Sequence, residues 1–338
     1  MWDEVVRLKN SFRLPRLSRN FTFSLIVLTF CDINVLVQLE KQSGATYFYP
    51  SPLLRWLLLL LTMSFSDVLE FVKTLRYCKQ HYPSFFHIFQ AQSFVDFVTV
   101  TVNQELLMTS KICDLDTINH LLNKNILFQN IQETFDFIQK SVSKEDLGLL
   151  DLDFICNCHQ QLLKNLIPSQ CTPAGQLSFC LRSASYKDKI HFYPHCKSYH
   201  EWFSQIQPVL DVYNSNFDRN IHQPLNLEHL KALLRNAAWI FQRLITFHPF
   251  ADGNGRMSRT ILAYSCIPIF GFPVFLYALR TYDGHSDLID ALQKQDTDRI
   301  LKFLVQSILL SRHLFGIRFK KWQKYISFGK SRTETGKN

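Results

Sequence analysis

Apolar residues recur at three- and four-residue steps along much of this chain, which is the spacing of amphipathic helices. In segment 227–246, for example, leucines, alanines and isoleucines fall along one face of a helix. The other segments with a helical pattern are 66–124, with a break at 81–84, and 132–142, 151–166 and 199–213. The pattern therefore predicts an all-α fold in which helices pack on helices.

Residues 168–194 depart from that spacing. Apolar and polar residues alternate over 177–182 and again over 189–193, and the polar residues 186–188 separate the two runs. Two short alternating runs around a polar turn predict a small β-hairpin. One hairpin among so many helices leaves the fold class all-α.

Two apolar stretches near the N-terminus raise the question of a membrane segment. Residues 21–31 follow a basic segment, but Asp32 and Asn34 interrupt the run after eleven residues, whereas a membrane span needs about 20. Residues 56–65 are shorter still. Runs of this length are typical of buried helices, so we expect no membrane contact and a cytoplasmic protein. The alternative is a membrane anchor or a secretory signal.

Composition excludes a disordered or fibrous protein, because 47% of the residues are apolar and Gly and Pro are few. Nine cysteines, an odd number at irregular spacing, argue against a disulfide framework and for a reducing compartment. Several Cys and His residues gather over 156–196, but none of the cysteines forms the CxxC pair that zinc sites prefer. We therefore expect no structural zinc there.

The net charge of +9 is concentrated at the C-terminus. Residues 312–338 hold eight basic residues and the single acid Glu334, so the rest of the chain is nearly neutral. We expect a solvated basic tail and no specific nucleic-acid binding. The alternative is a tail that contacts nucleic acid or an anionic membrane.

One loop carries the residues of phosphate chemistry. Gly253 and Gly255 allow a sharp turn and a close approach of the backbone to a ligand. The residues from Arg256 to Ala263 read as a new helix, so the turn lies at a helix N-terminus, where free N–H groups and the helix dipole attract anions. The loop therefore predicts a phosphate-binding site.

The side chains of this loop add to that prediction. His248 precedes it and could take a proton from a hydroxyl at neutral pH. Asp252 offers a hard carboxylate oxygen suited to a Mg²⁺ that bridges nucleotide phosphates. Arg256 and Arg259 lie three residues apart and can both reach further phosphates.

Residues 248–259, HPFADGNGRMSR, resemble the signature of Fic-domain proteins, HxFx(D/E)GNGRxxR, at every specified position. The resemblance extends over about 147–310. It includes the helix around His159, the turn Ala174-Gly175-Gln176 and the hairpin, which lies where the family has its target-binding flap. It implies the Fic fold, preceded here by a helical N-terminal region.

The family implies a role for each matched residue. His248 would be the catalytic base, Asp252 would bind Mg²⁺, and Phe250 would pack inward and hold the loop. The residues implied to bind the nucleotide are Gly253, Asn254, Gly255, Arg256 and Arg259, and those implied to bind the target, on the flap, are Lys189, Ile190, His191 and Phe192.

The implied function is protein adenylylation, the Mg²⁺-dependent transfer of AMP from ATP to a Ser, Thr or Tyr hydroxyl of a target protein. Two alternatives stay open. One is removal of AMP from a modified target, and the other is a pseudoenzyme that keeps the nucleotide site and binds a partner. A homodimer is also compatible with the resemblance.

Many Fic proteins carry an inhibitory helix with the motif (S/T)xxxE(G/N). The candidate here is Thr101 to Glu105, in which Glu105 would pair with Arg259. Leu106 departs from that motif, so a plain surface glutamate is the alternative. Gln176, where the family has a basic residue, and Pro268, which should end or kink its helix, also depart from the family pattern.

The sequence thus divides into four expected parts. They are an N-terminal helical region of unknown role over 1–95, candidate regulatory helices over 96–146, the Fic domain over 147–310 and the basic tail over 311–338.

Overall fold

The structure is a computed structural model, and it describes residues 64–109, 124–141, 147–166, 173–186, 189–276 and 282–334. The chain divides into two units, Met1–Ser64 and Phe65–Asn338. All of the described residues except Ser64 belong to the second unit. Two apolar stretches of the sequence analysis fall outside the described residues: all of 21–31, and residues 56–63 of the stretch 56–65.

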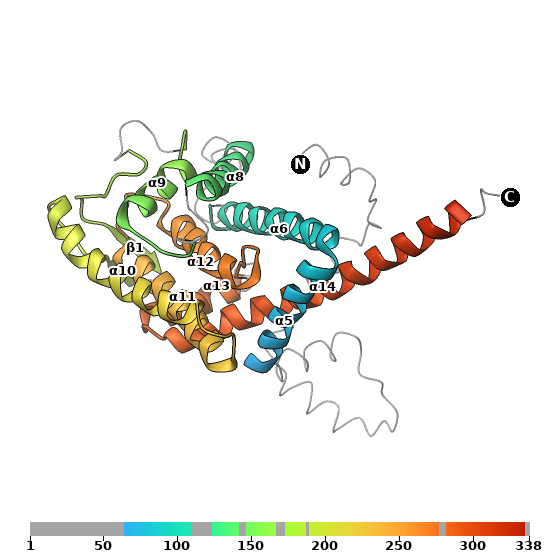
Figure 1. The fold of residues 1–338 in the computed structure, drawn as a ribbon. Coiled ribbons are helices and arrows are strands. Elements are labelled where there is room, and N and C mark those ends of the chain that lie inside the picture. The colour runs from blue at the N-terminus through green and yellow to red at the C-terminus, as the bar shows by residue number, and fades with distance from the viewer. Residues whose placement is uncertain are drawn as a thin grey trace, which may run out of the picture. The chain divides into compact units, whose positions relative to one another are not determined.

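The second unit is built of helices and one small hairpin, as predicted (Figure 1). Its elements are α5 (Phe65–His81), α6 (Pro83–Thr109), α8 (Lys124–Ser141), α9 (Leu152–Leu162), β1 (Ser183–Tyr186), β2 (Lys189–Phe192), α10 (Tyr199–Ile221), α11 (Leu227–Phe247), α12 (Asn254–Phe270), α13 (Tyr282–Gln293) and α14 (Thr297–Glu334). The predicted break at 81–84 is confirmed, because α5 ends at His81 and α6 begins at Pro83.

Helix α11 lies at the centre of the packing and contacts α10, α12 and α14. Its predicted apolar face is buried against them. Asn226 caps its start, because the Asn226 Oδ1 accepts a hydrogen bond from the His229 N–H at 2.9 Å. The C-terminal end of α11 carries His248, so the hydrophobic packing of this helix positions the predicted base.

Helix α12 is buried on nearly every side, which is typical of a central core helix. Pro268 lies in its last turn, and the helix ends two residues later at Phe270. Gly271 follows in the left-handed conformation, and its N–H donates to the Ile267 carbonyl at 2.7 Å. The helix thus continues through Pro268 for two residues and ends at the Gly271 cap.

The C-terminal helix α14 differs from expectation. The sequence predicted a basic tail from residue 311, but α14 runs through that position and packs against α5 and α6. Phe315 contacts the rings of Phe71, Phe85 and Phe89, with centroids 4.8–5.7 Å apart. Arg312 pairs with Asp67 at 2.9 Å and Arg318 with Asp96 at 2.8 Å. Two of the basic residues of this segment therefore form ion pairs within the folded unit.

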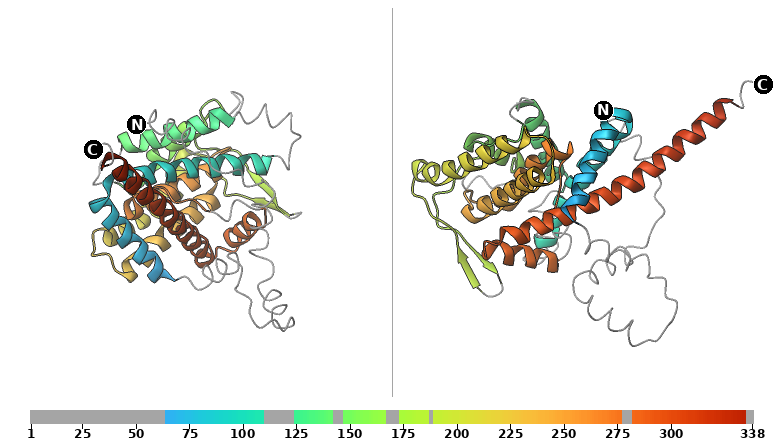
Figure 2. Two further views of the ribbon diagram at one scale, coloured as in Figure 1. Left: turned by 90° about the vertical axis from the view of Figure 1, so that its right-hand side faces the viewer. Right: turned by 60° about the horizontal axis from the view of Figure 1, so that its bottom comes forward.

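The same helix is long and apolar enough to cross a membrane over 297–325. Of the 18-residue apolar window in this span, 56% is buried inside the folded unit, as is typical of a core helix packed among other helices. Its C-terminal end extends beyond the other described helices (Figure 2).

The hairpin exists, but its first strand lies later than predicted. β1 and β2 pair antiparallel, with Ser183 opposite Phe192 and Tyr186 opposite Lys189. The alternating run 177–182 is not a strand. Leu177 is buried, but from residue 178 onward the expected polarity is inverted: Ser178 and Arg182 are buried, while Phe179 and Leu181 are exposed. The cause is the set of hydrogen bonds that Ser178 and Arg182 make with the neighbouring loop.

Candidate active site

His248 lies where α11 ends and the signature loop begins. Its backbone is left-handed, with φ +50° and ψ +54°, and its N–H donates to the Leu244 carbonyl at 3.1 Å. This conformation is uncommon for a residue with a side chain, and such outliers gather at functional sites. It ends the helix and turns the chain into the loop.

The His248 ring is largely enclosed. Burial lowers its pKa from 6.5 to about 4, and the positive charges of Arg182 and His191 act in the same direction. The Ile245 carbonyl and the Asp252 carboxylate favour the protonated form, but they only partly offset the effect of burial. His248 is therefore neutral at pH 7 and able to accept a proton.

The signature loop is braced from within by Asn254. The Asn254 Oδ1 accepts from the Phe250 N–H at 2.9 Å, and its Nδ2 donates to the Phe250 carbonyl at 2.8 Å. Asn254 is buried, and Phe250 is fully buried, as expected of it. The resemblance implied that the Asn254 amide contacts phosphate. In this structure both its oxygen and its nitrogen form hydrogen bonds with the main chain of its own loop.

His159, on α9, supports the loop from the other side. Its Nδ1 accepts from the Gly175 N–H at 2.9 Å, so its Nε2 must carry the proton that it donates to the Asp252 carbonyl at 2.8 Å. Its ring stacks on Phe250, with centroids 3.7 Å apart. Burial lowers the pKa of His159 to about 4, which keeps it in this neutral tautomer.

Arg182 joins the base of the hairpin to the loop. Its guanidinium donates to the Pro194 carbonyl at 2.6 Å and to the Phe250 carbonyl at 3.4 Å, and it lies over the Trp202 ring. Nearby, the Ser178 N–H donates to the Pro249 carbonyl at 2.8 Å, and Trp202 Nε1 donates to the Ser178 carbonyl at 2.9 Å. The predicted flap is therefore anchored to the signature loop.

The sequence alone predicts no role in the site for Arg182, Trp202 or Tyr193, whose ring stacks on that of His248 with centroids 3.7 Å apart. His159 is predicted only as a point of likeness to the family. No local signal marks them, because each acts through a partner far away in the chain: His159 lies 93 residues from Asp252, and Arg182 lies 68 from Phe250.

The loop leads into the N-terminus of α12 without a side-chain cap. Gly253 precedes that helix at φ +72°, and a Cβ there would lie 2.7–2.9 Å from the Leu163 side chain. Only glycine fits this position, because the conformation and the close approach both exclude a side chain. The uncapped N–H groups that follow form the type of helix terminus that attracts phosphate.

Charged side chains surround this helix terminus. The Asp252 side chain is 71% exposed, and its Oδ1 accepts from the Gly253 N–H at 2.6 Å. Arg256 is buried, with its NH2 3.6 Å from the Asp252 Oδ2. A Cβ on Gly255 would lie 3.2 Å from the Arg259 NH1, so that guanidinium reaches back along the first turn of α12. The structure thus brings these predicted residues together.

The predicted target-binding strand, β2, offers exposed side chains. Ile190, His191 and Phe192 are all exposed, while the side chain of Lys189 lies outside the described part of the chain. Phe179 and Leu181, which precede β1, are exposed as well. Apolar side chains thus lie open to solvent on a hairpin that is anchored to the loop.

Helix α6 brings the candidate inhibitory segment to α12. Thr101 is buried and lines a cavity of about 10 Å³ together with Arg259 and Leu262. Glu105 lies one turn further along α6, but its side chain is outside the described residues.

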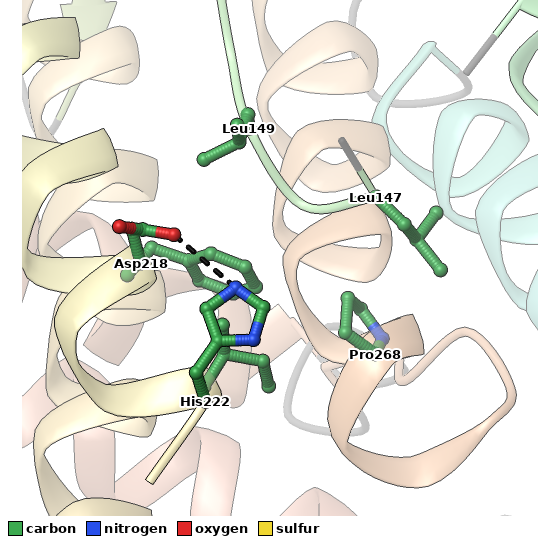
Figure 3. Close-up of a pocket in the computed structure, with 7 residues that line it drawn as sticks. Leu147, Leu149, Asp218, His222 and Pro268 are labelled. Carbon is green, nitrogen blue, oxygen red and sulfur yellow. Dashed lines mark ion pairs between the residues drawn. The ribbon is translucent and has the colours of Figure 1, made fainter. Parts of the chain in front are cut away.

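A larger cavity of about 230 Å³ is separate from this site (Figure 3). It is lined by Leu147, Leu149, Phe217, Asp218, Ile221, His222 and Pro268. Pro268 lies 14 residues after Asn254 on α12, a distance of about 21 Å along a helix that rises 1.5 Å per residue. Asp218 and His222, 3.2 Å apart, are both largely exposed, so we assign this cavity no part in the site.

Comparison with known proteins finds one family model that matches the segment with the signature loop and its supporting residues. Residues 149–266 match the model of the Fic/DOC family, a shorter stretch than the 147–310 expected. A Fido domain-containing protein of Dictyostelium discoideum is 51% identical over 37 residues, which are 11% of this chain and 25% of that protein. The match thus spans about a quarter of that curated relative.

Two solved structures share the fold. Fic-1 from C. elegans, residues 134–508, has a TM-score of 0.53 at 16% identity, over 91% of this chain and 86% of that one. A Fic domain containing signaling protein from Bacteroides thetaiotaomicron also gives 0.53 at 16% identity, over 76% of this chain and 97% of that one. Residues 149–266 thus match the Fic/DOC family model, and the two solved structures share the fold of this chain.

Proposed function

We propose that this protein is a protein adenylyltransferase, which transfers AMP from ATP to a Ser, Thr or Tyr hydroxyl of a target protein. Fic-domain proteins commonly transfer AMP or other nucleotide moieties to proteins. The observation that carries the proposal is the position of His248, neutral and enclosed, beside the uncapped N-terminus of α12. A base and an anion site so close together suit attack of a hydroxyl on a phosphate.

In the proposed reaction, His248 takes the proton of the target hydroxyl. The hydroxyl oxygen forms a bond to the α-phosphorus, and the bond from that phosphorus to the oxygen bridging to the β-phosphate breaks. Pyrophosphate leaves, AMP stays on the target as a phosphodiester, and the proton stays on His248. Protein groups act here through positioning and electrostatics.

The residues at the start of α12 would hold the nucleotide. The N–H groups from Gly253 to Arg256 would hold the α-phosphate as negative charge develops on it. The guanidinium groups of Arg256 and Arg259 would bind the β- and γ-phosphates. The Asn254 amide, engaged with Phe250, would act by holding the loop in shape.

Asp252 fits the role of a Mg²⁺ ligand. Its side chain is largely exposed, and the described residues contain no cluster of three or more His, Cys, Asp and Glu that could form an all-protein metal cage. Mg²⁺ is commonly bound by one or two carboxylates together with substrate phosphates and waters, which matches a single exposed aspartate. When bound, the ion would neutralise phosphate charge.

The flap would bind the target through the main chain of β2. The exposed side chains Ile190, His191 and Phe192, with Lys189 before them, would contact the target segment on either side of its hydroxyl residue. Addition of a strand gives affinity through backbone hydrogen bonds and tolerates many sequences.

The test is label transfer with the purified full chain, Mg²⁺ and a cell lysate. ATP labelled on the α-phosphate is expected to label protein, and ATP labelled on the γ-phosphate is not, because pyrophosphate leaves. His248→Ala should abolish labelling while ATP still binds. Label from the γ-phosphate alone would indicate a kinase and contradict the proposal.

Two further results distinguish the alternatives. ATP binding without any labelling, in the wild type and in the Glu105→Ala variant, would favour a nucleotide-binding pseudoenzyme. Release of AMP from a previously labelled target, dependent on both His248 and Glu105, would favour a deAMPylase.

We further propose that Glu105 restrains this site by pairing with Arg259. Support comes from α6, because residues four apart share a helix face and Thr101, four residues before Glu105, lines the same cavity as Arg259. An arginine occupied in this way could not bind the γ-phosphate.

The restraint is tested with Glu105→Ala, which should raise the rate of transfer by about tenfold or more, the equivalent of 1.4 kcal/mol. Glu228→Ala removes an exposed glutamate at the start of α11 and serves as the matched control. Equal rates in both variants and the wild type would mean that Glu105 is a plain surface residue.

A further inference from the structure

Tyr193 stacks on His248. It follows β2 directly, and its ring lies parallel to the imidazole, with centroids 3.7 Å apart and an interplanar angle of 8°. Tyr193 thus covers one face of the proposed base. Parallel stacking at this distance restricts the rotation of the imidazole ring.

The backbone of Tyr193 is held on both sides. Its N–H donates to the Arg182 carbonyl at 3.0 Å, and the Arg182 guanidinium donates to the carbonyl of the next residue, Pro194, at 2.6 Å. The same guanidinium reaches the Phe250 carbonyl at 3.4 Å. Tyr193 is therefore fixed at the junction of the flap and the signature loop.

The other groups that act on His248 come from each neighbouring element. They are Arg182 before β1, His191 on β2, Asp252 in the loop and the Ile245 carbonyl of α11. Among the described residues, Tyr193 is the aromatic ring that stacks on the imidazole. It also excludes water from that face, in agreement with the effect of burial on the pKa of His248.

We infer that Tyr193 is a positioning residue for His248: its ring holds the imidazole in the plane from which the ring edge meets the target hydroxyl, and it links the orientation of the base to the flap. This inference rests on the proposed function for its catalytic meaning. A base held in this way is aligned before the target arrives, which is the source of catalytic gain from orientation.

The first measurement is the NMR titration of the His248 ring in the full chain, with EDTA and without nucleotide. His248→Gln assigns the signal. Tyr193→Ala should raise the pKa of His248 by about one unit or more, because water then reaches the uncovered face. Tyr193→Phe keeps the stack and should titrate like the wild type. Tyr199→Ala, which removes a half-exposed tyrosine from α10, is the matched control and should leave the pKa unchanged.

The second measurement is the rate of AMP transfer against pH. Tyr193→Ala should lower kcat by about 10- to 100-fold, with the KM for ATP changed less than about twofold, because alignment and not nucleotide binding is lost. The acid limb of its profile should move to higher pH together with the pKa of His248. Tyr193→Phe should restore most of kcat.

Tyr193→Leu separates positioning from simple packing, because leucine fills space without a flat ring. If Tyr193→Ala does not fold, the comparison of Tyr193→Leu with Tyr193→Phe decides alone. The inference is supported if Tyr193→Phe has the kcat and the His248 pKa of the wild type while Tyr193→Leu has a lower kcat. Equal values in the two variants would overturn it. An unchanged pKa and kcat in folded Tyr193→Ala would also overturn it.

The two proposals fail in different ways. The titration needs neither ATP nor a target, so a pKa that responds to Tyr193 while no variant transfers label would contradict the proposed function and leave the contact established. Label transfer that is insensitive to Tyr193 would contradict the positioning role and leave the adenylyltransferase intact.

Discussion

At the scale of single residues, two histidines at this site, the buried His159 and the largely enclosed His248, are in the neutral form. His159 uses both ring nitrogens, one as donor to the Asp252 carbonyl and one as acceptor from the Gly175 N–H. Protonation would place a hydrogen on Nδ1, facing that N–H, and would break the bond. His248 is neutral because it is enclosed. At His159 the neutral form allows the two hydrogen bonds that support the loop. At His248 the neutral form leaves the ring able to accept a proton in the proposed reaction.

We expect His159→Asn to lower the free energy of unfolding at pH 7 by about 1–3 kcal/mol, because a buried hydrogen bond to the loop is lost. The pKa of His159 is about 4 in the fold against 6.5 ordinarily, so its contribution is complete above pH 6.5 and is lost as the pH falls toward 4. The difference between wild type and variant should therefore shrink at pH 5. Urea denaturation at pH 7 and pH 5 measures it, and a difference that grows at pH 5 would contradict this account.

At the scale of elements, the start of α12 depends on a glycine that its surroundings require. Gly253 combines a positive φ with a close approach to Leu163, a residue of the turn that follows α9. Gly316, in the middle of α14, meets neither condition, because a Cβ there would find nothing within 4 Å. The two glycines thus form a natural pair for testing how a site-forming turn differs from an ordinary helix position.

Gly253→Ala should destabilise the protein by about 1–3 kcal/mol and weaken ATP binding, because strain and the clash with Leu163 displace the first turn of α12. Gly316→Ala should instead stabilise it by about 0.5–1 kcal/mol, since alanine is the better helix former. Thermal denaturation and ATP titration measure both variants. Destabilisation by Gly316→Ala similar to that by Gly253→Ala would refute the distinction.

Many of the helices could be predicted from the sequence. Segment 227–246 forms a helix as its apolar spacing indicated, α9 covers residues 152–162 of the predicted 151–166, and the signature loop leads into a helix as expected. The first strand of the hairpin was misplaced because Ser178 and Arg182 form hydrogen bonds with the loop, and the buried and exposed positions over 178–182 are therefore the reverse of those predicted. Local alternation cannot report a hydrogen bond to a segment about 70 residues away.

At the scale of the folded unit, α14 joins the N-terminal helices to the core. Its aromatic residues pack against α5 and α6, while its first half lies along α11. Helix α6 in turn carries the segment proposed to restrain Arg259. The C-terminal helix therefore supports the position of α6 and does more than carry charge.

Phe315→Ala should cost about 3–5 kcal/mol of unfolding free energy, because this ring is buried among three phenylalanines of α5 and α6. Ile317→Ala, on the exposed side of the same helix, should cost less than about 1 kcal/mol. Chemical denaturation of both variants tests the packing. Equal, small effects would mean that residues from 311 onward form a separate tail after all.

The sequence by itself determined the family signature, the helical class and the chemistry available in the loop, because these depend on residue types at short spacing. The tertiary structure decided which groups hold that chemistry in place: His159 from α9, Arg182 and Tyr193 beside the hairpin, and α14 behind α5 and α6. The contacts of His159 with Asp252, of Arg182 with Phe250 and of Tyr193 with His248 join residues far apart in the chain. Their energies come from burial and geometry that arise only when the helices pack.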